Sequence, residues 1–120
     1  MIAMDGVLII DKPAGVTSHD VVARTRHILH ERRIGHTGTL DPFATGVLVI
    51  LVGKAPRLAQ FLNDVDKEYE AIIRLGYSTD TGDRTGTPIG GPLSQPREWR
   101  AEEIEAALKP FRGEIDQVPP

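Results

Sequence analysis

The chain has 120 residues, of which 40% are hydrophobic and 26% are charged. These are ordinary values for a globular protein, and they exclude wholesale disorder. The sequence has no cysteine, which excludes a disulfide framework, a thiolate metal site and a cysteine nucleophile. Its longest apolar run, residues 47–52, is far too short to cross a bilayer, and residues 1–10 lack the basic start of a signal peptide. We therefore expect a soluble, cytoplasmic protein with no membrane partner.

The net charge of −3 is not that of a typical nucleic-acid-binding protein, but the charges are unevenly distributed. Residues 1–60 carry seven Lys and Arg against five Asp and Glu, whereas residues 61–120 carry seven against twelve. The first half contains a basic stretch that comprises Arg24, Arg26, Arg32 and Arg33. This stretch is either a phosphate-binding surface or the solvated face of a helix, and charge alone favours the second interpretation.

The first two elements in chain order are a strand and a helix. Residues 6–10 form a short apolar run followed by Asp-Lys-Pro, which predicts a strand and then a turn. Thr17, with Asp20 three residues later, is typical of a helix N-terminus with a capping box, and apolar spacing predicts a helix to about Glu31. The side chains of this helix that we expect to be buried are Val21, Val22, Thr25, Ile28 and Leu29.

A loop, a second strand and a second helix follow. Residues 33–46 contain three glycines, three threonines and a proline without an apolar period, which predicts a loop. Residues 46–52 are continuously apolar and rich in β-branched side chains, which predicts a strand buried on both faces. Residues 54–62 predict a helix, and its inward side chains are expected to be Leu58, Ala59, Phe61 and Leu62.

The second half of the chain mixes a strand, turns and a helix. Residues 67–75 alternate apolar and polar side chains and predict a strand, whereas residues 76–92 are rich in Gly, Thr, Asp and Pro and predict turns. Residues 101–108 predict a short amphipathic helix that stops at Pro110, and residues 113–120 are a candidate strand. The mixed order of elements predicts an α+β (mixed α/β) fold.

The loop at residues 33–46 is where we expect function, because loops that carry Gly, His and Asp between rigid elements are common sites of chemistry. Asp41 lies shortly before the buried strand, with His36 nearby, and the flanking glycines allow the backbone to approach a ligand closely. A well-capped turn, in which Asp41 accepts backbone N–H groups and Pro42 fixes the shape, explains the same residues without a function.

Two other sites are weaker hypotheses. Ser18, His36 and Asp41 supply the residue types of a hydrolytic triad, but no nucleophile-elbow sequence surrounds the serine. A zinc site at His27, His30 and His36 lacks both cysteine and a His-Glu-x-x-His pattern, so these side chains fit surface histidines better.

The signature loop of TruB-type pseudouridine synthases, a family that includes dyskerin-like enzymes, closely resembles residues 35–48, GHTGTLDPFATGVL. Three further blocks of the family agree in order and spacing. They correspond to residues 6–18 (GVLIIDKPAGVTS), 66–69 (DKEY) and 75–86 (LGYSTDTGDRTG). The resemblance extends from Gly6 to Pro120, nearly the whole chain.

The resemblance implies a tRNA pseudouridine synthase, an isomerase that converts a T-loop uridine to pseudouridine, on a mixed, largely antiparallel sheet flanked by helices. It implies that Asp41 is the catalytic carboxylate, that His36 lies near the flipped nucleotide, and that Tyr69 stacks on the target uracil. Because the reaction oxidises nothing and loses no group, we expect neither cofactor nor metal. With tRNA as the partner, the candidates for contacts with the RNA backbone are Arg24, Arg32 and Arg33.

Members of the family continue well past residues 118–120. We therefore expect residues 1–120 to be the N-terminal part of a catalytic domain, without its C-terminal half and the RNA-binding domain that often follows. That half normally supplies an arginine that pairs with the catalytic aspartate. Two function classes stay open: an isomerase that is poorly active in this shortened form, and a non-catalytic module that binds or folds tRNA.

Overall fold

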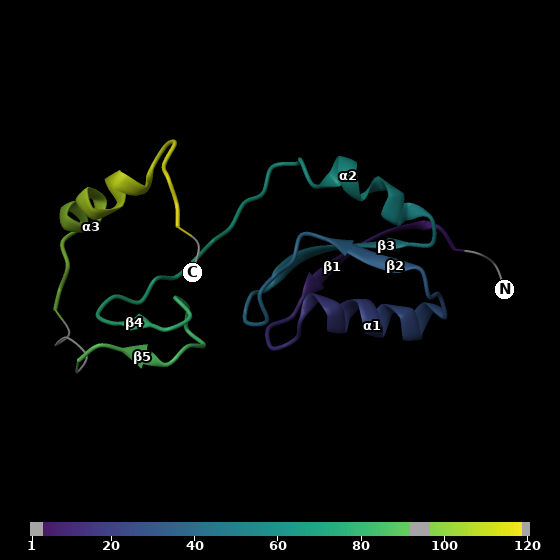
Figure 1. The fold of residues 1–120 in the computed structure, drawn as a ribbon, viewed down its shortest axis with the longest axis horizontal. Coiled ribbons are helices and arrows are strands. Elements are labelled where there is room, and N and C mark those ends of the chain that lie inside the picture. Colours follow the sequence, from purple (N-terminus) through teal and green to yellow (C-terminus); the bar gives the residue numbers. More distant parts are fainter. Residues whose placement is uncertain (1–3, 92–96, 119–120) are drawn as a thin grey trace. The chain divides into compact units, whose positions relative to one another are not determined.

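The computed structural model describes residues 4–91 and 97–118, and the chain forms two compact units, Met1–Tyr69 and Glu70–Pro120. The first unit contains a three-stranded antiparallel sheet with helices, and the second contains a two-stranded antiparallel ladder and a helix (Figure 1). The predicted α+β class with largely antiparallel pairing is therefore confirmed. None of the helices in the described ranges is long and apolar enough to cross a membrane.

The sheet of the first unit has β3 (Gly46–Val52) at its centre, between β1 (Gly6–Lys12) and β2 (Ile34–Thr37). Both neighbours run antiparallel to β3. The first residue of each neighbour, Gly6 in β1 and Ile34 in β2, lies opposite Val52 at the end of β3. Strand β1 is two residues longer than the apolar run predicts, because pairing with the start of β3 continues to Lys12.

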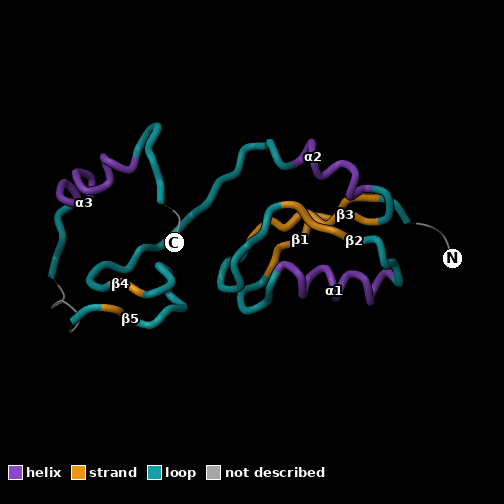
Figure 2. The backbone as a smooth tube through the Cα atoms, in the orientation of Figure 1, coloured by secondary structure: helices purple, strands orange, loops and turns teal. Residues whose placement is uncertain are grey.

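Helix α1 (Ser18–Leu29) lies along one face of this sheet (Figure 2). The capping box is confirmed: the amide of Asp20 donates to Thr17 Oγ1 at 3.0 Å, and the amide of Thr17 donates to Asp20 Oδ2 at 2.8 Å. The helix ends at Leu29, two residues earlier than predicted, and His30 closes it in the left-handed conformation with φ of 52°.

The core lies between α1 and the sheet. Every second residue of β3 points toward the helix, as the two-residue period of a strand requires. The buried cluster consists of Val22, Ile34, Leu48, Ile50 and Val52, with Ile10, Val21 and Leu29 packed against it.

One residue of the predicted apolar face of α1 is exposed. Ile28 keeps 62% of its surface, whereas Val22 and Thr25 are buried. At 100° per residue, Ile28 lies furthest round the helix from Val22 among the five residues predicted to be buried, so it sits at the margin of the contact with the sheet.

The opposite face of the sheet is covered at one end only. The 3₁₀ helix η1 (Ala55–Leu58) packs there, burying Leu51, and a Cβ placed on Gly35 would lie 3.9 Å from Pro56 Cγ. Val47, at the other end of β3, is 68% exposed. The prediction of a strand buried on both faces therefore holds for the second half of β3 but is wrong for its start.

The predicted helix at residues 54–62 is a 3₁₀ turn, η1, followed by one turn of α-helix, α2 (Ala59–Leu62). Ala59 and Leu62 are partly buried as expected. Leu58 and Phe61 keep 47% and 68% of their surfaces, so the prediction that they point inward is wrong. Two short turns present too narrow a face to bury all four side chains.

The predicted loop at residues 33–46 contains β2 in its first part, so the loop prediction is wrong for these four residues. A four-residue strand with a glycine and two polar residues has no recognisable apolar period. Pairing with β3 rather than local propensity makes this segment a strand.

In the second unit, β4 (Ser78–Thr79) pairs with β5 (Pro88–Ile89) inside the predicted turn region, of which residue 92 lies outside the described ranges. Helix α3 (Ala101–Leu108) has the predicted bounds, and the 3₁₀ helix η2 (Lys109–Phe111) continues it past Pro110.

Two predicted strands are not found. Residues 67–75 form no ladder with any described residue, and Ile72 is 98% exposed, so an alternating sequence without a partner strand stays unpaired. Residues 113–118 also form no strand, and residues 119–120 lie outside the described ranges.

Candidate functional site

Asp41 begins a tight turn between β2 and β3. The amide of Ala44 donates to the carbonyl of Asp41 at 3.0 Å, which closes a four-residue turn with Pro42 in its second position. Proline favours that position because its ring fixes φ near the value that common turns need. The residue Asp41 is exposed, so its carboxylate is open to a ligand.

The residue before Asp41 is anchored to the start of α1. The hydroxyl of Ser18 accepts from the amide of Leu40 at 3.1 Å and lies 3.3 Å from the carbonyl of Leu40. Ser18 is buried, and its hydroxyl is hydrogen-bonded to the backbone of Leu40. This is a structural role, unlike that of a nucleophile in a hydrolytic triad.

The residue after Asp41 is anchored to the turn that follows β1. The carbonyl of Pro42 accepts from the amide of Gly15 at 2.7 Å and from Lys12 Nζ at 3.2 Å. Both chain neighbours of Asp41 are thus bonded to residues 12–18, from the end of β1 to the start of α1. The backbone beneath the carboxylate is held on each side by the same segment.

Lys12 is a site residue that sequence reasoning missed. Its side chain has no exposed surface, although lysine is almost never fully buried without partners. Its ammonium group donates to the carbonyls of Pro13 at 2.9 Å, Val16 at 2.7 Å and Pro42 at 3.2 Å, which uses all three of its hydrogens. The Asp-Lys-Pro sequence at the end of β1 was the signal available, but its pattern indicated only a turn.

Two glycines bound the site loop in conformations that other residues rarely adopt. Gly38, directly after β2, has φ of 68°, and Gly46, at the start of β3, has φ of 123°. A side chain at either position would strain the backbone. The glycines that the sequence analysis assigned to close ligand approach therefore also set the path of the loop.

His36 lies on β2 on the same face as Ile34, the face that packs against α1. Its ring meets the ring of His19, in the first turn of α1, edge to face, with centroids 5.6 Å apart and planes at 79°. Nδ1 of His36 is buried, and no described residue provides it with a hydrogen-bond partner. His36 and the Asp41 turn are therefore both linked to the N-terminal turn of α1.

Tyr69 is not brought into this group. It is 70% exposed and is the last residue of the first unit. Its ring does not stack on His36, and its hydroxyl forms no hydrogen bond with Asp41 or His36. Its segment has no partner strand, so Tyr69 is not an inward-facing residue of a sheet.

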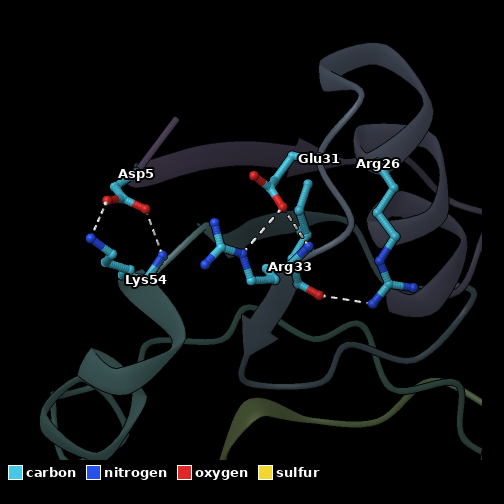
Figure 3. Close-up of polar contacts among 6 residues, drawn as sticks. Asp5, Arg26, Glu31, Arg33 and Lys54 are labelled. Carbon is cyan, nitrogen blue, oxygen red and sulfur yellow. Dashed lines mark hydrogen bonds and ion pairs between the residues drawn. The ribbon is translucent and has the colours of Figure 1, made fainter. Parts of the chain in front are cut away.

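The three candidate arginines are exposed and differ in their partners. Arg33 pairs with Glu31, whose Oε1 accepts from the Arg33 amide at 2.9 Å and lies 3.5 Å from Arg33 Nε (Figure 3). The hydrogen bond from the Arg33 backbone is the main cause that lowers the pKa of Glu31 below its usual value. The side chains of Arg24 and Arg32 form no hydrogen bond or ion pair with the described residues, and both residues are exposed to solvent.

Arg26, the remaining member of the basic stretch, is bound to the protein itself. Its Nη2 donates to the carbonyl of Ile34 at 2.9 Å, which ties the last turn of α1 to the start of β2 (Figure 3). Figure 3 also shows Asp5 accepting from the amide of Lys54 at 2.7 Å, a contact that fixes the chain after β3. These two contacts support the sheet rather than the site.

The arrangement can hold the Asp41 carboxylate against the sugar or base of a ligand, because the backbone on each side of it is fixed. Asp41 stands on a turn with both neighbours anchored, and no Lys, Arg or His of the described ranges forms an ion pair with it. An exposed carboxylate with a fixed backbone can act as a nucleophile or as a base. Within the same ranges, no group of three side chains is arranged to hold a metal ion.

Comparison with known proteins gives consistent matches. The family described as TruB family pseudouridylate synthase (N terminal domain) matches residues 26–120. The chain is 50% identical over 117 residues to tRNA pseudouridine synthase B of Solibacter usitatus and 46% identical over 122 residues to that of Bacillus pumilus. These alignments cover 98% of the chain but only 39% and 38% of the relatives, so the chain spans about two fifths of their length.

A solved structure described as an H/ACA RNP bound to a substrate RNA containing 2′-deoxyuridine is also similar. It is 51% identical, with a TM-score of 0.46, over 48% of this chain and 18% of the other. The family match covers most of the chain and includes His36, the Asp41 turn and Tyr69. The chain therefore belongs to the TruB family of pseudouridylate synthases and corresponds to part of its N-terminal domain.

Proposed function

We propose that the protein isomerises a T-loop uridine of tRNA to pseudouridine and that Asp41 is its catalytic carboxylate. The observation that carries this proposal is the Asp41 turn, in which an exposed carboxylate stands between two anchored residues. Similarity to tRNA pseudouridine synthase B relatives supports the substrate and the reaction. The chain spans about two fifths of the length of these relatives. Within the proposed active site, its contribution is Asp41 and the residues that anchor the Asp41 turn.

One well-placed carboxylate can carry the bond changes of the proposed reaction. The bond between ribose C1′ and uracil N1 breaks, the base turns, C5 bonds to C1′, and the hydrogen on C5 leaves as a proton. Asp41 either attacks C1′, to be displaced later by C5, or removes a proton from C2′ and returns it. Atoms and electrons balance without a redox partner, so the proposed reaction uses no cofactor.

The uridine must leave its stack before the carboxylate can reach the ribose. Flipping a base costs a few kcal/mol. Stacking on an aromatic side chain returns about 1–3 kcal/mol per base, which is the role proposed for Tyr69. His36, on the face of β2 nearest α1, is proposed to contact the flipped nucleotide and the rearranged T-loop.

A second function is favoured by one observation. No cation of the described ranges pairs with Asp41, and Tyr69 makes no contact with the turn. A chain whose Asp41 has no cationic partner and no nearby Tyr69 can bind tRNA without converting its uridine. The alternative is therefore a non-catalytic module that binds or folds tRNA.

The two functions are distinguished by detecting pseudouridine directly. The chain is incubated in excess over a tRNA transcript, and pseudouridine is mapped by carbodiimide modification and reverse transcription. We expect slow conversion at the T-loop only, slower than that of the Solibacter usitatus relative, and none in a transcript with cytidine at that position. Retained tRNA binding without any pseudouridine would instead favour the RNA-binding module.

The arginines give the proposal an electrostatic test. Arg24→Glu and Arg32→Glu should each lower the slope of log affinity against log salt by about one, because each contact with a phosphate releases about one counterion. Arg33→Glu should lower it less, because Arg33 already pairs with Glu31. The matched control is Arg57→Glu, on η1 across the sheet from α1. Slopes that all equal that of the unmodified chain would show that these arginines only face solvent.

A further inference from the structure

The ring of His36 lacks the contact that usually orients a histidine. Histidine rings are commonly held by a hydrogen bond from one nitrogen to a carbonyl or carboxylate. Nδ1 of His36 is buried, and it has no such partner among the described residues. Because buried polar atoms are normally paired, this nitrogen calls for an explanation. Rotation of the ring about its Cβ–Cγ bond must be limited by packing instead.

The packing partner is the ring of His19. The two rings meet at 79° with centroids 5.6 Å apart, inside the range in which edge-to-face aromatic pairs are favourable. His19 lies directly after Ser18, which is buried and bonded to Leu40, and directly before Asp20 of the capping box. The backbone that carries His19 is therefore fixed on both sides.

We propose that His19 is a positioning residue that holds the ring of His36 in the orientation that meets the RNA. The inference rests on the proposed function, in which His36 contacts the flipped nucleotide. His19 acts through His36 and has no role in breaking or forming bonds. An edge-to-face contact needs an aromatic ring but not an imidazole, so phenylalanine at position 19 should replace histidine.

The first arm of the test uses the free chain and needs no RNA. Histidine side chains are labelled with ¹³C, and the Hδ2–Cδ2 signal of His36 is assigned by its loss in His36→Asn. His19→Ala should shift this signal by more than its line width, because the ring current and the orientation both change. His19→Phe should keep the ring of His36 in place, with the nuclear Overhauser contacts of that ring unchanged from those of the unmodified chain. His27→Ala, which removes a ring that meets His30 instead, should leave the signal unchanged.

The second arm of the test measures how tightly the chain binds a T-arm RNA and how fast it converts it. His19→Ala should weaken its binding by about 2- to 10-fold, which corresponds to the energy of one aromatic pair. The rate at which saturating RNA with tritium at uridine C5 releases its label into water should stay within about twofold, and His19→Phe should restore the affinity. A His36 signal that is unmoved in His19→Ala, or a phenylalanine variant as weak as the alanine variant, would overturn the proposal. An unmodified chain that neither binds nor converts the RNA would refute the proposed function, and the first arm would still decide the role of His19.

Discussion

The ammonium group of Lys12 is surrounded by backbone carbonyls beneath the Asp41 turn. Hydrogen bonds to a charged donor contribute about 1.5–3 kcal/mol each, and unpaired buried carbonyls add a cost when the donor is removed. Lys12 is fully buried with three such bonds, one of which reaches Pro42. This side chain therefore stabilises the site loop more than its position in a turn sequence suggests.

Lys12→Met should lower the free energy of unfolding by about 3–5 kcal/mol, because it leaves three carbonyls without their charged donor. Urea unfolding followed by circular dichroism measures the change. The control is Lys54→Met, whose exposed ammonium lies 3.9 Å from Asp5, and which should cost less than about 1 kcal/mol. Equal losses for the two variants would contradict the assigned role of Lys12.

Single residues differ in how far the sequence predicts them. Thr17 and Asp20 were recognised as a cap because a capping box depends on residues three apart in the chain. The contacts of Lys12 with Pro42 and of His19 with His36 join segments 30 and 17 residues apart. No local pattern records such contacts, so sequence reasoning named Asp41 and His36 but not the residues that hold them.

At the scale of elements, the cap of α1 has a consequence for acid stability. The hydrogen bonds from the backbone and hydroxyl of Thr17 hold the pKa of Asp20 below its usual value of 3.8. A carboxyl group with a lowered pKa stabilises the fold above its unfolded pKa and loses that contribution as pH falls through the folded value. The helix should therefore weaken below about pH 4.

Thr17→Ala should reduce stability at pH 7 by about 1 kcal/mol, the typical cost of losing a capping hydroxyl. It should also move the pKa of Asp20 part of the way back toward 3.8, because the side-chain bond from Thr17 is lost while the bond from its backbone amide stays. Urea unfolding and carboxyl NMR titration measure the two effects, and Thr17→Ser should preserve both. A Thr17→Ala variant with an unchanged Asp20 titration would show that the cap does not form in solution.

The core face of α1 and β3 gives a second prediction at this scale. Ile50→Ala should cost about 2–5 kcal/mol because Ile50 is fully buried in the central strand. Ile28→Ala should cost less than about 1 kcal/mol because Ile28 is 62% exposed. Denaturant unfolding of the two variants tests the packing, and a large loss for Ile28→Ala would mean that the helix buries the face predicted from its sequence.

Elements were predicted well where the chain determines them locally. The capped helix α1, the apolar strand β3 and helix α3 each have a strong period or cap. The sequence predicts a loop where β2 forms and a strand at residues 67–75 where none forms, because a strand exists only where a neighbour pairs with it. Sequence alternation reports which side chains suit a sheet, not whether a partner strand is present.

At the scale of the whole molecule, the first unit contains the buried core together with the Asp41 turn and its anchors. Its sheet leaves apolar side chains exposed on the face away from α1, among them Ile9 and Val47. Surface of this kind usually marks a region that contacts further protein. The α+β class and the family were predictable from patterns and motifs, whereas which side chains of the sheet are uncovered was visible only in the structure.

The central claim is that Asp41 is the catalytic carboxylate. Its most direct test compares the Asp41→Asn variant with the unmodified chain in a single-turnover measurement of tritium release. The chain is held in excess over tRNA that carries tritium at uridine C5, and release of the label into water is followed. The claim predicts that Asp41→Asn lowers the release rate by at least about 100-fold while tRNA affinity stays within about twofold. Asp116→Asn, the same change at another exposed aspartate, should have no effect. Equal release by the Asp41→Asn variant and the unmodified chain would contradict the assignment of Asp41 as the catalytic carboxylate.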